Sequence, residues 1–140
     1  MKVEIRKARL DKDKDQLEFL LKSLKEDHRS WYVNEVEEMF EGDSTIWLME
    51  VDDKPIGFAD LGRYEGREIF NMLFILPAYR NRGLGTRLAS YVIQHSKNDV
   101  VYGYVHHANV PALKILMKLG FRVDDDGGEF IRYVLRKSGK

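Results

Sequence analysis

A loop with two arginines leads into the start of a helix near the middle of the chain. It reads Arg80-Asn-Arg-Gly-Leu-Gly-Thr86 and follows the apolar run 69–76, which Pro77 ends. The first N–H groups of a helix have no partner within the helix, and the helix dipole adds partial positive charge there. Gly83 and Gly85 leave those N–H groups open to a ligand, and arginine side chains suit phosphate oxygens. The pattern therefore predicts a site for a phosphate or pyrophosphate group.

Two well-known phosphate loops do not fit this stretch. It contains no Gly-Lys-Ser/Thr, as a Walker loop requires, and no third glycine completes the dinucleotide-binding fingerprint. Glycines open many helices and arginines are common on surfaces, so an ordinary helix start remains an alternative. A nucleotide held by the same loop is another.

The hydrophobic periodicity places this loop between a strand and a helix of a mixed α/β (α+β) chain. The run 69–76 is apolar nearly throughout, which favours a strand covered on both faces near the middle of a sheet. The residues 124–128, Asp-Asp-Asp-Gly-Gly, are predicted to form a tight turn. The full order is β-α-α-β-β-β-α-β-α-β, with strands at 3–7, 45–51, 56–61, 69–76, 100–105 and 130–136, and helices at 13–26, 30–41 (Ser30 as N-cap), 83–95 and 110–119.

Composition limits the classes of function. The 140 residues fit a single domain, 1–140. The absence of cysteine excludes disulfides, cysteine-bound zinc and a covalent cysteine intermediate. The 23 basic residues balance 23 acidic ones, unlike a protein that binds nucleic-acid backbone. No apolar stretch is long enough to span a bilayer. We expect a cytoplasmic protein that uses no metal, nucleic acid or membrane.

Two segments, in order, resemble the GNAT-type N-acetyltransferases. Arg80-x-x-Gly-x-Gly85, with the strand before it, is similar to motif A of that family. Asn109-x-x-Ala112, followed by Leu-Gly-Phe at 119–121, resembles motif B. The likeness is close over residues 69–122. It implies a mixed, mostly antiparallel sheet flanked by helices. It also implies an acyl-CoA-dependent N-acyltransferase, which moves acetyl from acetyl-CoA directly to a primary amine of a small molecule or peptide.

The resemblance also implies where acetyl-CoA would lie. The pyrophosphate would sit on the N–H groups of residues 82–86, and the pantetheine arm would pair with the exposed backbone of residues 73–75, where the central strands of that family separate. Asn109 would contact the arm from the opposite side of the gap between the central strands. An asparagine at this point is also a good helix N-cap. The implied cofactor-binding residues are Leu73, Phe74, Ile75, Arg80, Asn81, Arg82, Gly83, Leu84, Gly85, Thr86 and Asn109.

The resemblance leaves the catalytic groups incomplete. It implies a backbone N–H near Ile75 as the donor to the oxyanion. Asn71 stands where many members have a carboxylate base, and it could hold a water that relays the proton. Leu116 stands where many have a tyrosine acid. Tyr104, or Tyr102 on the same strand, could replace that acid, with aromatic packing as the alternative role.

Two acidic residues near Asn71 in the sequence, Glu68 and Asp60, are expected to be solvated and so not to act as the base.

The strength of the base bears on the substrate. A weak base would suffice for an α-amine of pKa ~7.7–8.0 but not for a lysine amine of pKa ~10.4, which favours α-amines or weakly basic amines as acceptors. The departures at 71 and 116 also leave open a CoA-binding regulatory module that transfers nothing. Exposed edge strands allow a homodimer.

Overall fold

The computed structural model describes residues 1–26 and 35–138. Their strands are β1 (Val3–Lys7), β2 (Asp43–Val51), β3 (Lys54–Tyr64), β4 (Arg67–Ile75), β5 (Val100–His106), β6 (Arg122–Asp126) and β7 (Phe130–Arg136). Their helices are α1 (Leu10–Glu26), α2 (Val36–Met39), α3 (Leu84–His95) and α4 (Val110–Lys118), with a short 3-10 turn at Pro77–Tyr79.

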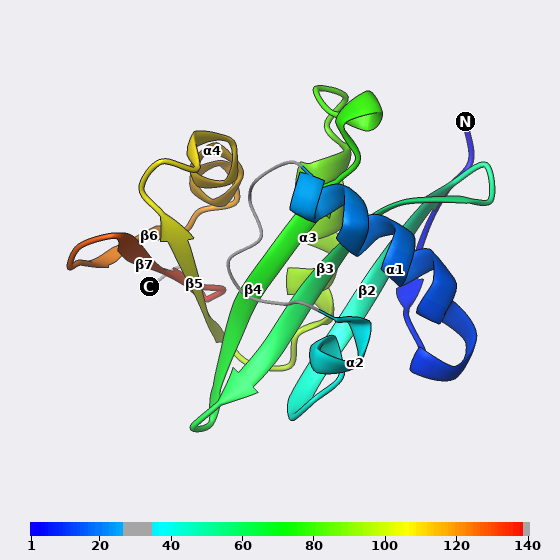
Figure 1. The fold of residues 1–140 in the computed structure, drawn as a ribbon. Coiled ribbons are helices and arrows are strands. Elements are labelled where there is room, and N and C mark those ends of the chain that lie inside the picture. The colour runs from blue at the N-terminus through cyan, green and yellow to red at the C-terminus, as the bar shows by residue number, and fades with distance from the viewer. Residues whose placement is uncertain (27–34, 139–140) are drawn as a thin grey trace.

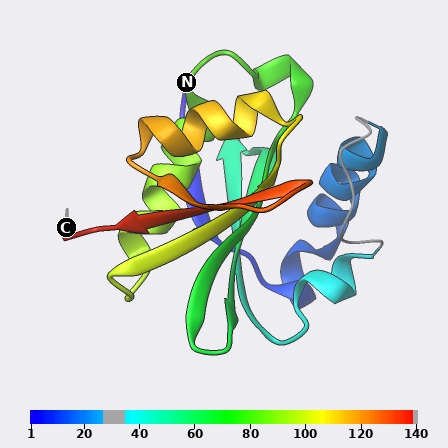
Figure 2. The same ribbon diagram turned by 90° about the vertical axis from the view of Figure 1, so that its left-hand side faces the viewer.

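All the strands join one sheet in the order β1-β2-β3-β4-β5-β7-β6. Neighbouring strands are antiparallel except β4 and β5, which are parallel. Helices α1 and α2 lie on one face, and α3 and α4 lie on the other (Figures 1 and 2). The expected mixed, mostly antiparallel sheet flanked by helices is therefore confirmed, and β4 occupies its middle.

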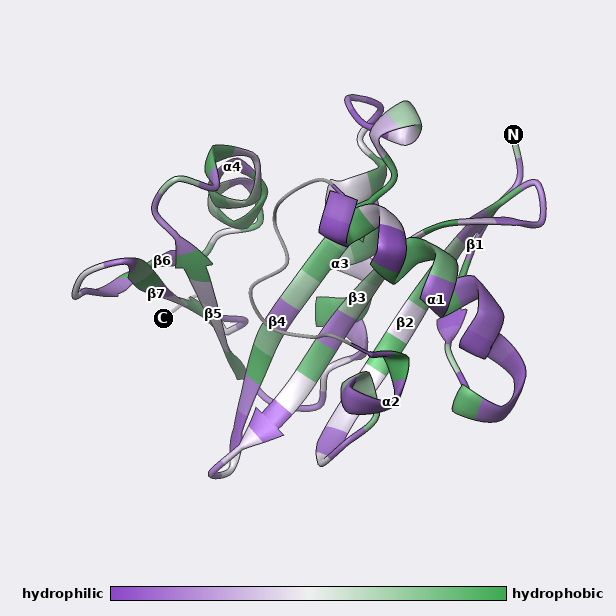
Figure 3. Cartoon of the chain, in the orientation of Figure 1, coloured by the Kyte–Doolittle hydropathy of each residue, from purple (hydrophilic) through white to green (hydrophobic). Residues whose placement is uncertain are grey.

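Each face of the sheet carries its own hydrophobic core. On one face, the leucines that recur at helical spacing in α1 pack with Phe58 and Phe74, whose ring centroids are 6.0 Å apart. On the other face, α3 packs against β3 and β4 through residues such as Leu88 and Val92. Figure 3 shows the hydrophobic middle of the strands and the largely hydrophilic outer side of α1. The apolar run in β4 is explained by this burial on both sides.

The predicted turn at 124–128 is wrong for its first three residues. Residues 122–126 form strand β6, which pairs antiparallel with β7, and the turn falls at 127–129. Every residue of β6 is exposed, so no alternation of apolar residues marked it as a strand. Of the helix predicted over 30–41, the structure describes α2 alone; Ser30 and residues 27–34 lie outside the described residues.

An ion pair between a buried carboxylate and a partly exposed arginine fixes the start of α1 to the sheet. The Asp13 carboxylate is 2% exposed. It accepts from both terminal nitrogens of Arg6, at 2.9 and 2.8 Å, and from the Arg9 N–H at 2.8 Å. The Arg6 guanidinium holds the pKa of Asp13 below its usual value. The pair therefore stabilises the fold when the carboxylate is ionised.

Asp13→Asn is expected to lower the free energy of unfolding at pH 7 by about 2 kcal/mol, because a hydrogen bond to a charged group contributes about 1.5–3 kcal/mol. Arg6, whose side chain is 41% exposed, stays accessible to water and keeps a second partner in Glu50. Because the pKa is lowered in the fold, this contribution is present above the unfolded pKa and is lost as pH falls through the folded one. Urea unfolding at pH 7 and pH 3 measures it. Asp11→Asn, at an exposed partner of Arg9, is the control and should change stability little; equal effects of the two substitutions would contradict the assignment.

Candidate active site

The two central strands separate along part of their length. β4 and β5 pair only between residues 68–70 and 101–103. Beyond that point β4 continues to Ile75 and β5 to His106, and the strands diverge toward α4 (Figure 1). A cavity of about 570 Å³ lies at this gap, lined by the diverging strand segments, the loop before α3 and the first two turns of α4.

The backbone N–H and C=O groups of successive β4 residues point to alternate edges of the strand, so those of Leu73 and Ile75 point into the gap. The Leu76 N–H donates to the Ile56 carbonyl at 2.8 Å, on the β3 side. Successive residues of a strand address opposite edges, so Leu73 and Ile75 direct their N–H and C=O groups away from β3 and into the gap. The backbone of Phe74 instead faces its partner Phe58 on β3. Of the three residues predicted to offer backbone to a ligand, Leu73 therefore turns both groups into the gap. Ile75 offers its N–H there, since its carbonyl accepts from Arg80 Nε at 2.9 Å.

The glycines at the start of α3 serve different purposes. Gly83 is the N-cap and has φ +77°, a left-handed conformation that side chains disfavour, with open space where a Cβ would be. A Cβ on Gly85 would lie 3.2 Å from Ile115 Cδ1 of α4, so Gly85 also permits close helix packing. Asn81 in the preceding loop has φ +64°. These residues, with Leu84 and Thr86, line the cavity.

The two arginines are not equivalent. Arg80 lines the cavity, and its Nε donates to the Ile75 carbonyl at 2.9 Å. Its guanidinium also lies 5.5 Å from the centre of the Phe74 ring. Arg82 is exposed over the ring of Tyr79 and is not among the lining residues. The structure thus brings Arg80 to the cavity and leaves Arg82 at its outer side.

Helix α4 closes the cavity on the far side of the gap. The Asn109 Oδ1 accepts from the Ala112 N–H at 3.4 Å, as an N-cap does, and Asn109 also lines the cavity. At the other end, Gly120 has φ +99° and the Phe121 N–H donates to the Leu116 carbonyl at 3.0 Å. Leu116 is buried and lines the cavity, so a non-titrating side chain occupies this place.

Asn71 sits in a β-bulge that faces the cavity. Asp60 pairs with Met72 and the next residue, Leu61, pairs with Phe70, so Asn71 is the extra residue of β4. It is exposed, lines the cavity and donates a side-chain hydrogen bond to Asp60.

The two acidic residues expected in solvent are both buried. Glu68 is 5% exposed and accepts from Ser96 Oγ at 2.6 Å and the Asn98 N–H at 2.9 Å, which ties β4 to the end of α3. Asp60 is 6% exposed, and burial raises its pKa to about 7 despite hydrogen bonds from Ser44 and Asn71. In the sequence, the place of Asp60 within an otherwise apolar strand was the one indication that it could be buried.

Of the two tyrosines on β5, Tyr104 is the one at the cavity. It is 38% exposed, and the guanidinium of Arg132 on β7 donates to its hydroxyl. Tyr102 instead packs under Arg67, whose guanidinium lies 5.2 Å from its ring centre.

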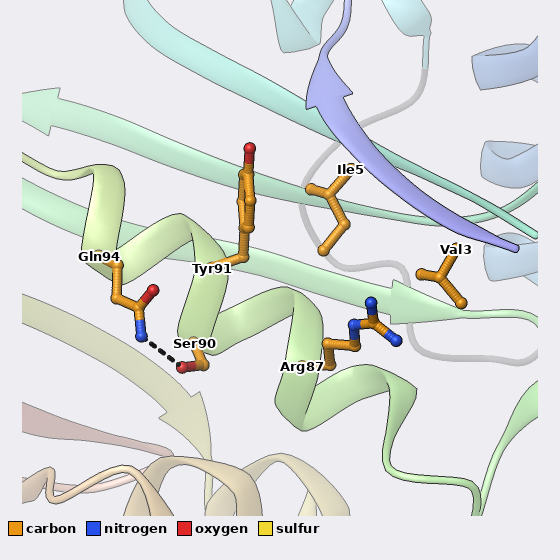
Figure 4. Close-up of a pocket in the computed structure, with 6 residues that line it drawn as sticks. All are labelled: Val3, Ile5, Arg87, Ser90, Tyr91 and Gln94. Carbon is orange, nitrogen blue, oxygen red and sulfur yellow. Dashed lines mark hydrogen bonds between the residues drawn. The ribbon is translucent and has the colours of Figure 1, made fainter.

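A second, smaller cavity of about 270 Å³ lies between β1 and α3 (Figure 4). Val3 and Ile5 face Tyr91 and Arg87 across it, and none of the predicted site residues lines it. Within residues 1–26 and 35–138, no helix is long and apolar enough to cross a membrane. The same residues form no cluster of three or more metal-ligating side chains.

A parallel strand pair that opens beside a glycine-capped helix is the architecture of the GNAT acetyltransferases, and solved structures of that class superpose on nearly the whole chain. One is the PaiA N-acetyltransferase of Thermoplasma acidophilum in complex with coenzyme A, with a TM-score of 0.74, 22% identity, and coverage of 97% of this chain and 99% of the other. Another is yncA of Salmonella typhimurium, a putative acetyltransferase with acetyl-CoA, with a TM-score of 0.74, 17% identity, and coverage of 98% and 95%.

Sequence comparison agrees with the fold. The profile of the acetyltransferase (GNAT) family matches residues 10–121, and the chain belongs to this family. A curated relative, the uncharacterized N-acetyltransferase MJ1207 of Methanocaldococcus jannaschii, is 29% identical over 101 residues. That match covers 65% of this chain but only 45% of the relative, so the chain spans less than half of the length of that protein. The resemblance inferred from the two motifs is confirmed.

Proposed function

We propose that this chain is a single-domain N-acetyltransferase, which transfers acetyl from acetyl-CoA directly to a primary amine of a small molecule or peptide. The observation that carries the proposal is the shared cavity: the backbone of Leu73 and Ile75, which has no strand partner in β5, and the open N-terminus of α3 line the same space. Two structural neighbours are complexes with coenzyme A or acetyl-CoA, which supports this cofactor.

The residues present fit such a cofactor. In the proposal, the N–H groups of residues 82–86 hold the pyrophosphate, and Arg80 adds positive charge beside them. The peptide groups of Leu73 pair with the pantetheine arm, which runs along β4 to Ile75, and Asn109 bounds the arm from the α4 side. Acetyl-CoA supplies a thioester, whose carbonyl carbon the amine attacks.

Three groups of this chain would serve the transfer. The Ile75 N–H is the donor to the developing oxyanion. Asn71 holds a water at the bulge, on the path of the amine's proton. Tyr104 is the acid that protonates the leaving thiolate. By analogy with cysteine, the thiol has a pKa near 8.5, so the thiolate can leave with little help from an acid. The absence of cysteine agrees with direct transfer.

Calorimetry with acetyl-CoA, CoA and ATP tests the cofactor. Acetyl-CoA and CoA are expected to bind and ATP is not; preference for ATP, or no binding of CoA, would contradict the proposal. Thiol release from acetyl-CoA, measured with a panel of α-amines, lysine derivatives and weakly basic amines, then tests transfer. Binding of CoA without thiol release for any amine would favour a regulatory module, for which Leu116 in place of an acid is the supporting observation.

Tyr104→Phe is expected to lower kcat about 10-fold with an unchanged affinity for acetyl-CoA, which is less than the usual 10²–10⁴-fold contribution of a general acid because a thiolate leaves easily. Thiol release and calorimetry measure the two quantities. Tyr102→Phe is the matched control, since that ring does not line the cavity. Equal kcat values for the two variants would remove Tyr104 from the mechanism.

A further inference from the structure

We propose that Asp60 accepts the proton of the acceptor amine, through a water molecule held by Asn71. This inference deepens the proposed transferase function and rests on it. The cavity brings Asn71 to the reacting groups, but an amide does not titrate. Asp60, which accepts a hydrogen bond from Asn71, does titrate.

Asp60 lies in an apolar setting and is incompletely bonded. It sits on the sheet face covered by α1 and α2, and its strand partners Ile46 and Met72 are buried hydrophobic residues. No donor among the described residues reaches its Oδ1. A buried acceptor without a partner costs about 1–3 kcal/mol. Packing alone therefore does not explain an aspartate at this position. Its Oδ1, which has no donor among the described residues, can accept a proton.

The connection from Asp60 to the cavity depends on a glycine. A Cβ on Gly62 would collide with Asn71 Nδ2 and would lie 3.2 Å from Ser44 Oγ. The Asn71 amide therefore occupies the space that Gly62 leaves free, where it reaches Asp60. Of these four residues only Asn71 lines the cavity. Figure 3 shows the hydrophilic bands that cross β3 and β4 between hydrophobic stretches.

The local electrostatics suit a base that works near neutral pH. Ser44 and Asn71 are neutral, and Ile46 and Met72 are apolar. The buried hydrophobic side chains that α1 and α2 turn toward this face are Leu17, Leu20, Leu21, Leu24, Val36 and Met39. Among the described residues of these two helices, the one buried charged residue, Asp13, is paired with Arg6 of β1. No charged group of the described residues contributes to the pKa of Asp60, which burial raises to about 7. A general base is most effective when its pKa lies near the working pH.

The proposed step balances. The ammonium of the acceptor gives one proton to the water, which passes a proton to the Asp60 carboxylate. The nitrogen lone pair then forms the C–N bond to the thioester carbon, and the C–S bond breaks with its electron pair on sulfur. The second proton of the nitrogen ends on the thiolate, so the products are the amide and CoA thiol. Asp60 returns its proton to solvent.

Asp60→Asn tests this assignment while it preserves the shape of the side chain. We expect kcat/KM for an amine of pKa ~10.4 to fall about 100-fold or more, and for an aromatic amine that is already neutral at the assay pH to fall less than about 3-fold. The acidic limb of the wild-type pH–rate profile, near pH 7, is expected to disappear. A purely structural role would affect both amines alike.

Two further variants separate proton transfer from folding. Glu68→Gln is the matched control, because Glu68 is equally buried on the neighbouring strand. It accepts from Ser96 and the Asn98 backbone and pairs with Arg63 at 3.9 Å. It does not line the cavity, so its substitution should leave the pH profile unchanged. Gly62→Ala displaces the Asn71 amide. Since the hydrogen bond from Asn71 lowers the pKa of Asp60, its loss should move the acidic limb to higher pH.

Calorimetry with acetyl-CoA distinguishes the two levels of the proposal. Equal affinity in wild type and Asp60→Asn, with the acidic limb and the amine dependence unchanged, would overturn the role of Asp60 alone. Absence of acetyl-CoA binding by the wild type would overturn the transferase function and the relay together. Equal affinity with loss of the acidic limb in Asp60→Asn supports both.

Discussion

Replacing Gly83 by aspartate is expected to weaken the binding of acetyl-CoA and CoA by about 100-fold or more. Gly83 is the N-cap of α3 at φ +77°, and nothing lies within 4 Å of the place of its Cβ. Asp is one of the few residues that tolerate this conformation, so the fold should survive. Its carboxylate would stand where the proposed pyrophosphate binds, and like charges in contact cost several kcal/mol, while 100-fold corresponds to about 2.7 kcal/mol.

Two control variants divide this effect into charge and backbone strain. Gly83→Asn has the same shape and the same tolerance of positive φ but no charge, so it should weaken binding far less. Gly66 lies in the turn between β3 and β4, at φ +79°, also with nothing within 4 Å. Gly66→Asp therefore imposes the same strain away from the cavity and should bind CoA normally. Calorimetry measures all three; equal affinity of Gly83→Asp and wild type would remove the phosphate from this helix start.

The open helix start beside the cavity, where we propose that phosphate binds, could be anticipated because local sequence determines it. A helix start with glycines and arginines has the same exposed N–H groups whatever surrounds it. Local sequence also determines the end of α4, where Gly120 takes the left-handed conformation that glycine favours and Phe121 is buried after it. The separation of β4 from β5 was available only through the family resemblance, because it depends on pairing between distant segments.

The place of Asp60 in an apolar strand did not decide whether it is buried, and no pattern in the sequence marked β6 as a strand. An aspartate in a strand can face either solvent or protein, and only the packing of α1 and α2 decides which for Asp60. The strand β6 has no buried residue, so its pairing with β7 follows from backbone geometry and not from an apolar pattern. The difference between Arg80 and Arg82 depends on the path of the loop, because the 3-10 turn at Pro77–Tyr79 returns Arg80 to the Ile75 carbonyl.

The burial of Asp60 should also be visible in the stability of the protein. The pKa of this group is raised from 3.8 to about 7 in the fold. Between these values the unfolded chain has released the proton while the folded chain still holds it, so stability falls as pH rises from about 4 to about 7 and is constant above. The full loss amounts to about 4 kcal/mol. Asn does not titrate, so the difference in free energy of unfolding between Asp60→Asn and wild type should grow by this amount in favour of the variant.

Urea unfolding of both proteins at pH 4.5, 6 and 8 measures that difference. Other titrating groups, such as Asp13 with its lowered pKa, are common to the two proteins and cancel. Parallel stability curves would show that Asp60 titrates as it does in the unfolded chain, and hence that it is solvated. A growing difference, together with slower transfer by the variant, would show that the protein retains a destabilising buried acid because the reaction uses it. The same carboxyl group would then explain a loss of stability and a gain of activity over one pH range.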